Sequence, residues 1–216
     1  MFSPFRYTTM DLDKKIIYMQ ALFRGHRVRQ ALMKTEDKMS LDIVKKLVDH
    51  YNETLRFHAL INTELSKKKI RNENFPSHNS ENIAKFAIAK KYGVMPTWDT
   101  KKGDLVIEKP GIQKQIEVKG FMSDGPSSFG PTESWDWLYF VDARRTLEGT
   151  FKVYEIKLSN KDPRFRSVKL NKNETYGEIA DNNQRGKLRG AFEKIFHPQL
   201  RSHCNLIFDG TLDDLA

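Results

Sequence analysis

The sequence contains one cysteine, Cys204, among 216 residues. A single cysteine cannot close an intramolecular disulfide or build a cysteine-based zinc cluster. The six histidines also stand apart, and none pairs with a cysteine or a second histidine at metal-ligand spacing. Glycine-rich nucleotide-binding loops and a G-x-S-x-G elbow are missing as well. These absences exclude zinc sites, the common nucleotide-binding motifs and serine hydrolases of that type.

Long hydrophobic runs are also missing. No stretch approaches the length of a membrane span, and the opening residues MFSPFRYTTMDLDKK hold no apolar signal-peptide core. We therefore expect an intracellular, cytoplasmic protein without membrane contact. The nucleus or a viral factory is the alternative if the source is eukaryotic or a eukaryotic virus. The length suits one sizeable domain with a helical extension.

Acidic residues are outnumbered in this chain. Asp and Glu total 28 against 37 Lys and Arg, which gives a net charge of +9. A basic surplus of this size favours a polyanionic partner such as nucleic acid. The charge alone is equally compatible with a soluble basic protein that has no polyanionic partner.

The segment KKGDLVIEKPGIQKQIEVKG, residues 101–120, holds the most informative pattern. Alternate residues of a strand point to the same face, so Glu117 and Lys119 should emerge side by side. If LVIE and QIEVK pair as neighbouring strands, Asp104 can reach Glu117. Oxygen ligands of this kind suit magnesium, and a lysine beside them can orient a water or stabilise charge on a phosphate. The pattern favours metal-assisted phosphodiester hydrolysis, and a surface hairpin with a solvated ion pair is the alternative.

The spacing also resembles a known family. Asp104, twelve residues, Glu117, one residue and Lys119 match the D-x(n)-(D/E)-x-K signature of the PD-(D/E)xK nucleases. The chain departs from the family name at Gly103, where proline is common.

The residues after the signature extend this resemblance. A loop rich in Gly, Pro and Ser covers residues 123–133, and the hydrophobic run Trp137 to Val141 then predicts a buried strand. Residues 103–143 as a whole resemble type II restriction endonucleases. The resemblance implies an α/β fold with a restriction-endonuclease-like core, in which helices flank a mixed central β-sheet, plus an N-terminal helical extension.

The resemblance further implies sequence-specific cleavage of double-stranded DNA that depends on magnesium, with manganese able to substitute. Asp104 and Glu117 would bind the metal, the carbonyl of Val118 would add a ligand, and Lys119 would position the attacking water. The products would carry 5′-phosphate and 3′-hydroxyl ends. Because one active site cuts one strand, cleavage at a palindrome suggests a homodimer. The N-terminal helices are the expected dimer surface.

The first third of the chain predicts helices. Apolar residues at helical spacing indicate one helix over residues 11–23 and a second after Ser40. A polar, Pro-containing stretch then breaks the pattern. We expect a helical region over residues 1–75 and the nuclease core over residues 76–216.

A third helix is expected over residues 80–92, with Asn79 or Ser80 as its cap and Gly93 just past its end. Glu81 would lie in its first turn. By resemblance to related enzymes, Glu81 is a further metal ligand. The alternative is that Glu81 only complements the helix dipole, as acids in first turns usually do.

Three further elements are expected towards the C-terminus. The segment TFKVYEIKLS predicts a strand with at least one solvent-facing side, which would carry Lys152, Glu155 and Lys157. A helix is expected around residues 182–196. CNLIFDG would add an edge strand.

Basic residues cluster in the last quarter of the chain, where phosphate contacts would orient a duplex. The loop after the signature could lie along a groove or build the rim of the metal site, and its serines and Glu133 could equally form turns. Ordinary solvated lysines and arginines would give the same pattern. The residues predicted to contact DNA are Ser127, Ser128, Arg164, Arg166, Lys169, Arg185, Lys187 and Arg189.

A second motif lies in the predicted first helix. It resembles the IQ motif through which helices engage calmodulin-like proteins. The alternative is that its apolar residues pack on the core or on a partner subunit while its arginines contact DNA. The residues that carry the match are Met19, Gln20, Arg24, Gly25 and Arg29.

Two other functions remain open from the sequence. The first is a repair or recombination nuclease of the same superfamily, which would recognise a DNA structure instead of a base sequence. The second is a basic binding protein without enzymatic activity, which would recruit DNA or a calmodulin-like partner.

Overall fold

The computed structural model describes residues 40–64, 74–99, 104–130, 132–184 and 186–216. Residues Ser40–Ala216, to which all the described residues belong, form one compact unit that is separate from Met1–Met39. The helix expected over residues 11–23, the IQ-like residues within and beyond it, and Arg185 all lie outside the described residues.

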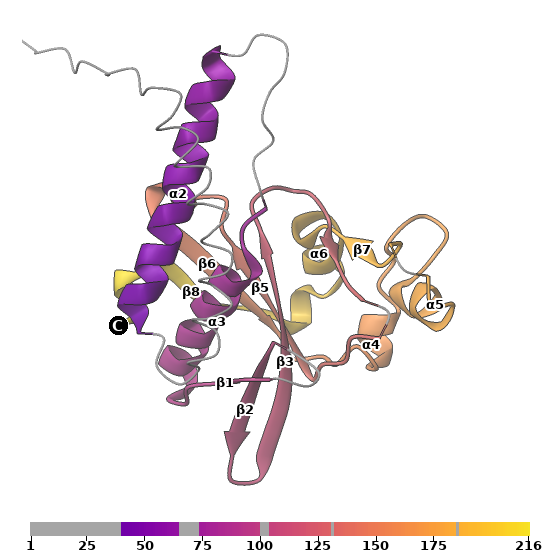
Figure 1. The fold of residues 1–216 in the computed structure, drawn as a ribbon. Coiled ribbons are helices and arrows are strands. Elements are labelled where there is room, and N and C mark those ends of the chain that lie inside the picture. Colours follow the sequence, from indigo (N-terminus) through magenta and orange to yellow (C-terminus); the bar gives the residue numbers. More distant parts are fainter. Residues whose placement is uncertain (1–39, 65–73, 100–103, 131, 185) are drawn as a thin grey trace, which may run out of the picture. The chain divides into compact units, whose positions relative to one another are not determined.

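Two long helices precede the sheet (Figure 1). Helix α2 (Leu41–Glu64) follows Ser40, and its buried residues Val44, Val48, Tyr51 and Leu55 recur at steps of four and three along one face. Helix α3 (Ser77–Tyr92) ends, as predicted, at Gly93, which has a left-handed φ of 66°.

A six-stranded mixed sheet forms the centre of the unit, in the order β1-β2-β3-β5-β6-β8. β3 and β5 run parallel, and the other neighbours are antiparallel. β2 and β3 confirm the predicted pairing of LVIE with QIEVK, and β8 confirms the predicted edge strand. The strands are β1 (Thr97–Trp98), β2 (Leu105–Lys109), β3 (Ile112–Phe121), β5 (Trp137–Asp142), β6 (Thr150–Ile156) and β8 (Cys204–Thr211).

Strand alternation assigns the residues of β3 to two faces. Gly120 faces α3, and a Cβ atom there would lie 1.9 Å from Ser80 Oγ, so the helix can approach the strand this closely only because residue 120 has no side chain. Phe121 faces the opposite side, where its ring centroid lies 5.4 Å from that of Phe192. Glu117 and Lys119 share this second face, because they precede Phe121 by four and two positions in the strand.

An aromatic cluster fills the second face. Figure 1 shows α2 and α3 on one side of the sheet and α4, α5, α6 and β7 on the other. The cluster includes Phe121, Phe129, Trp135, Phe140, Phe165, Tyr176, Phe192 and Phe196. Its covering elements are α4 (Pro163–Arg166), α5 (Tyr176–Asp181), the π-helix η2 (Phe192–Phe196), α6 (His197–Gln199) and a two-stranded ribbon of β4 (Ser127–Ser128) and β7 (Arg189–Gly190). The 3₁₀ helices are η1 (Thr146–Glu148), η3 (Arg201–His203) and η4 (Asp213–Leu215).

Two sequence predictions about helices are wrong in detail. Helix α3 begins at Ser77 after Pro76, and Asn79 and Ser80 are buried inside it instead of capping it. The long helix expected around residues 182–196 does not form. Its first half contains left-handed backbone at Asn183 and Gly186, which a helix cannot accommodate, and only the π-helix at its end is helical.

The predicted strand over residues 150–159 exists as β6, but one of its expected solvent-facing residues is buried. Glu155 is 1% exposed and accepts hydrogen bonds from two tyrosine hydroxyls. None of the described helices is long and apolar enough to cross a membrane.

Candidate functional site

The pairing of β2 with β3 brings Asp104 opposite Glu117. The register Leu105↔Ile116 places these two residues at the next position along the pair. Asp104 N donates to Ile116 O at 3.0 Å, and Asp104 Oδ2 accepts from Val118 N at 2.7 Å. The N–H and C=O groups of one strand residue point to the same side, so the Val118 carbonyl also faces Asp104. Carboxylate and carbonyl oxygens therefore gather at this edge of β3.

Lys119 lies in the middle of this cluster. Its ammonium forms an ion pair with Glu117 Oε1 and lies 3.4 Å from Glu133 Oε2. The ammonium is also 5.3 Å from the centroid of the Phe129 ring. The side chains of Lys119 and Glu117 are 17% and 6% exposed, so this contact is largely removed from solvent.

The electrostatics of the site show an excess of negative charge. Burial raises the pKa of Glu117 to about 8; repulsion from Asp104 and Glu133 adds to this effect, and Lys119 opposes it. Burial likewise raises the pKa of Asp104. Burial opposes the charged form of Lys119, but the attraction of the surrounding carboxylates outweighs it and raises the pKa of the ammonium. One lysine therefore does not balance the carboxylates of this site, and a further cation would stabilise their charged forms.

Helix α3 brings a further carboxylate, Glu81, to the same cluster. Burial raises the pKa of Glu81 to about 7, and the charge of Asp104 adds to this effect, while Ser77 and Lys119 oppose it. The helix-dipole explanation of Glu81 requires an acid in the first turn, and the first turn of α3 holds none because the helix begins at Ser77. The prediction that Glu81 lies in the first turn is therefore wrong, although the structure brings it near the signature residues.

The chemistry of the donor set fits a hard divalent cation. Asp104, Glu117 and the Val118 carbonyl offer oxygen atoms, which magnesium prefers. Within the described ranges, no group of three or more His, Cys, Asp or Glu side chains is arranged as a metal site. In this conformation Glu117 is paired with Lys119 instead.

In a comparison with protein families, residues 42–193 match the Bsp6I restriction endonuclease family. The chain belongs to this family. The matched range is well over half of the chain and contains every candidate site residue described above. Searches of curated proteins and of solved structures found no match. The mixed six-stranded sheet flanked by helices is consistent with a restriction-endonuclease-like fold.

Three of the predicted DNA contacts of this restriction-endonuclease-like protein lie together beside the site. Ser127 pairs with Gly190 and Ser128 pairs with Arg189 in the β4–β7 ribbon. The next residue, Phe129, donates its N–H to Leu188 O at 2.9 Å and turns its ring towards Lys119. The ribbon therefore connects directly to the signature residues, and the side chain of Arg189 is exposed on it.

The other predicted DNA contacts have different surroundings. Arg164 is bound by two nitrogens to Asp162, and Arg166 forms an ion pair with Asp181. Lys187 lies 3.6 Å from Glu174, and Lys169 is exposed. These carboxylates already neutralise the two arginines, so Arg189 is the best placed of the three described arginines in the set to meet a phosphate.

One residue of the site was not predicted from the sequence. The sequence allowed Glu133 to be a turn-former or part of a loop at the rim of the metal site, and the structure brings its carboxylate within ion-pair distance of Lys119. The sequence carried no signal for this, because the loop has no regular periodicity from which side-chain direction could be inferred.

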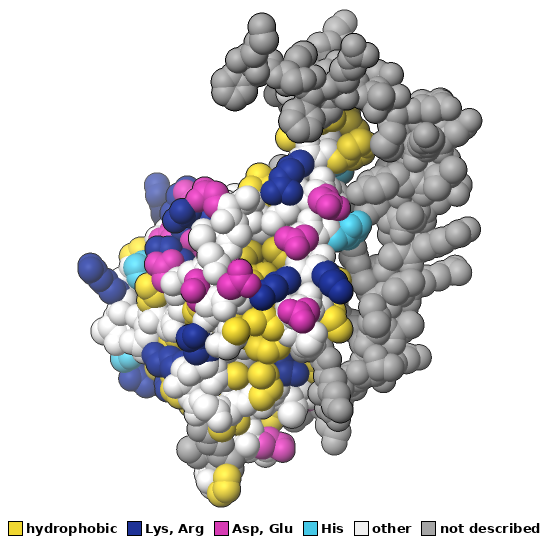
Figure 2. Space-filling view, turned by 90° about the vertical axis from the view of Figure 1, so that its left-hand side faces the viewer, with side chains coloured by type: hydrophobic (Ala, Val, Ile, Leu, Met, Phe, Trp, Pro, Cys, Tyr) yellow, Lys and Arg dark blue, Asp and Glu magenta, His cyan; other side chains and the backbone are white. Residues whose placement is uncertain are grey.

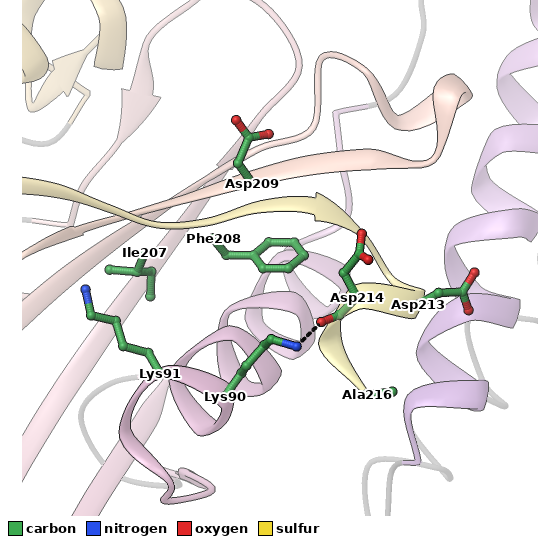
Figure 3. A pocket seen from close by; sticks show the side chains of 8 residues that line it. All are labelled: Lys90, Lys91, Ile207, Phe208, Asp209, Asp213, Asp214 and Ala216. Carbon is green, nitrogen blue, oxygen red and sulfur yellow. Dashed lines mark hydrogen bonds between the residues drawn. The ribbon is translucent and has the colours of Figure 1, made fainter.

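A pocket of about 640 Å³ lies elsewhere, between the end of α3 and the C-terminus (Figure 3). Lys90 donates a hydrogen bond to the carbonyl of Asp214 at its edge. None of the signature residues lines this pocket. Basic and acidic side chains are intermixed on the side of the molecule shown in Figure 2, so the visible charges there form no single-sign surface.

Proposed function

We propose that this member of the Bsp6I restriction endonuclease family is a type II enzyme of the PD-(D/E)xK kind, which cleaves double-stranded DNA at specific sequences with magnesium. The observation that carries the proposal is the buried cluster of Asp104, Glu117 and Lys119, in which carboxylates outnumber cations. Buried, perturbed carboxylates of this kind are typical of functional sites.

Asp104, Glu117 and the carbonyl of Val118 would hold the magnesium, with Glu81 as a further carboxylate beside them. Manganese, which also prefers oxygen ligands, would substitute. When bound, the cation supplies positive charge to the scissile phosphate and makes a water more acidic.

Lys119 has two possible tasks in this chemistry. Its amine orients the attacking water and helps to remove a proton, or its ammonium stabilises the charge that develops on the phosphate. The water oxygen forms a bond to phosphorus, and the bond from phosphorus to the 3′-oxygen breaks. The products are a 5′-phosphate and a 3′-hydroxyl.

The β4–β7 ribbon would lie against the DNA beside the scissile phosphate. Arg189 supplies charge, and Ser127 and Ser128 supply hydroxyl groups to the phosphate backbone. Cleavage of both strands at a palindrome requires two sites, so we propose that a homodimer binds the duplex. Sedimentation of the protein with and without a DNA fragment tests this assembly.

The first experiment incubates the purified protein with magnesium and a long unmodified duplex, alongside Asp104→Ala, and sequences the DNA ends. We expect discrete fragments with 5′-phosphates from the wild-type protein and none from the variant. Equal cutting by both proteins would overturn the assignment of the site. Cleavage only at junctions, nicks or mismatches would instead favour a structure-specific nuclease.

A further inference from the structure

Glu133 lies in the loop between β4 and β5, and its side chain reaches the signature lysine. Glu133 Oε2 is 3.4 Å from Lys119 Nζ. This oxygen is buried and accepts no hydrogen bond from any described residue. A buried carboxylate oxygen is costly unless a cation or donor offsets its desolvation, and Lys119 is the cation that the structure places beside it.

The loop holds Glu133 in place from three directions. Its N–H donates to Gly130 O at 3.2 Å, and its carbonyl accepts from Asn160 Nδ2 at 2.6 Å. Its side chain lies against Gly130, where an added Cβ would come within 3.0 Å of Glu133 Oε1. The carboxylate is therefore built into the site and does not belong to a loosely held surface side chain.

Lys119 contacts two carboxylates, and we expect only one of them to bind a metal. Glu117 stands beside Asp104 on the β2–β3 pair and would turn its oxygens to a metal, while Glu133 contacts the same ammonium from a loop outside the signature. An oxygen that binds a divalent cation forms a weaker ion pair with Lys119. The ammonium then needs a second carboxylate to keep its position.

We propose that Glu133 is the positioning residue for Lys119, holding and orienting its ammonium once Glu117 binds the metal. This inference rests on the proposed function. It assigns to the loop a role in the reaction, because the loop that carries the DNA-facing ribbon also carries the partner of the signature lysine. The Phe129 ring lies beside the same ammonium and limits the directions in which it can move.

Glu133→Gln tests the proposal, because it keeps the size and removes the charge. Glu148→Gln is the matched control, since Glu148 also pairs with a cation, Arg145, but lies on η1. We expect Glu133→Gln to lower kcat at saturating DNA and magnesium at least about tenfold. The KM for DNA, the magnesium concentration at half-maximal rate and the thermal midpoint should stay close to those of Glu148→Gln. An unchanged kcat would overturn the proposal, and so would a raised magnesium requirement, which would make Glu133 a metal ligand.

A second readout does not need cleavage. The ¹⁵N signal of the Lys119 ammonium, assigned by its loss in Lys119→Arg, is followed in protein loaded with calcium and duplex DNA. We expect the signal to shift or disappear in Glu133→Gln and to stay in place in Glu148→Gln. An unmoved signal in Glu133→Gln overturns the pairing. If the wild-type protein cuts no DNA, the proposed function fails, and the ammonium signal still decides whether Glu133 holds Lys119.

Discussion

Two buried glutamates lie on opposite faces of the same sheet and have opposite surroundings. Glu155 on β6 accepts hydrogen bonds from Tyr139 at 2.6 Å and from Tyr92 at 2.7 Å. Glu117 on β3 is nearly as buried, but its neighbours include two other acids, and its main cationic partner is Lys119. Glu155 therefore has two hydroxyl donors and Lys157 at 3.6 Å, whereas Glu117 shares one lysine with other carboxylates and is left short of positive charge.

We propose that this difference separates a structural acid, Glu155, from a functional one, Glu117. A buried carboxylate with enough donors stabilises the packing around it, since its desolvation is offset within the fold. A buried carboxylate among other carboxylates is unfavourable unless a ligand supplies charge. The second arrangement is a hypothesis of function, and the following predictions test it against the first.

The largest expected effect comes from Glu117→Gln. Removing this charge should lower cleavage at least about 10³-fold, because the proposed metal loses a ligand. DNA binding in calcium and the thermal midpoint should be largely retained. Glu155→Gln is the matched change on the other face. It should keep cleavage but lower the free energy of unfolding by about 1–3 kcal/mol, because the amide leaves hydroxyl donors poorly paired. The opposite pattern in cleavage assays and denaturation would show that the two roles are reversed.

Lys119→Ala should have the next largest effect. We expect cleavage to fall about 10²–10³-fold, with metal binding retained, because the lysine acts on the water or phosphate. Lys157→Ala is the comparison, since Lys157 lies 3.6 Å from Glu155 and over the rings of Tyr92 and Trp137. Its loss should leave the cleavage rate near that of the wild-type protein. Single-turnover rates and calorimetric titration with calcium measure the two properties separately.

The sequence predicted the surroundings of Glu117 better than those of Glu155. Glu117 could be placed because strand period, turn position and family signature all agree on where its side chain points. Glu155 was expected to face solvent because of its charge, although strict alternation puts it on the face of the buried Phe151 and Val153. Tyr92 from α3 and Tyr139 from β5 converge on it there. Long-range contacts of this kind are set by the packing of a helix on a sheet.

The same dependence on long-range packing explains why the positions of Glu81 and Glu133 could not be inferred from the sequence. The sequence placed the start of α3 three residues late, so it misjudged the turn on which Glu81 lies, because Ser80 and Asn79 are common caps that here pack against the sheet. Glu133 follows an irregular loop whose course depends on the aromatic cluster beneath it. Regular elements could be inferred from local pattern, and these loop and cap positions could not.

The stability of the metal-free protein should depend on pH, because the site holds more carboxylates than cations. Glu117 has a folded pKa of about 8 and Glu81 one of about 7, against an ordinary value of 4.5. The folded state therefore binds more protons than the unfolded state between these values, and stability should fall as pH rises from about 5 to 8. Glu117→Gln should flatten this decline. Magnesium or calcium at pH 8 should raise the thermal midpoint by binding the folded state. A midpoint that is constant over this pH range and insensitive to both cations would argue against the site.

The smallest expected effect concerns the β4–β7 ribbon, which connects to Lys119 through Phe129. Arg189 is exposed on β7 opposite Ser128, whereas Arg164 is already bound to Asp162. Arg189→Ala should weaken DNA binding in calcium and reduce the slope of log K against log salt by about 1, because one phosphate contact is lost. Arg164→Ala should leave the slope nearly unchanged, because its charge is neutralised within the protein. Fluorescence anisotropy at several salt concentrations measures both slopes. Equal losses of affinity from the two variants would mean that DNA contacts α4 as well as the ribbon. The DNA-binding surface would then not be limited to the loop region that holds Glu133.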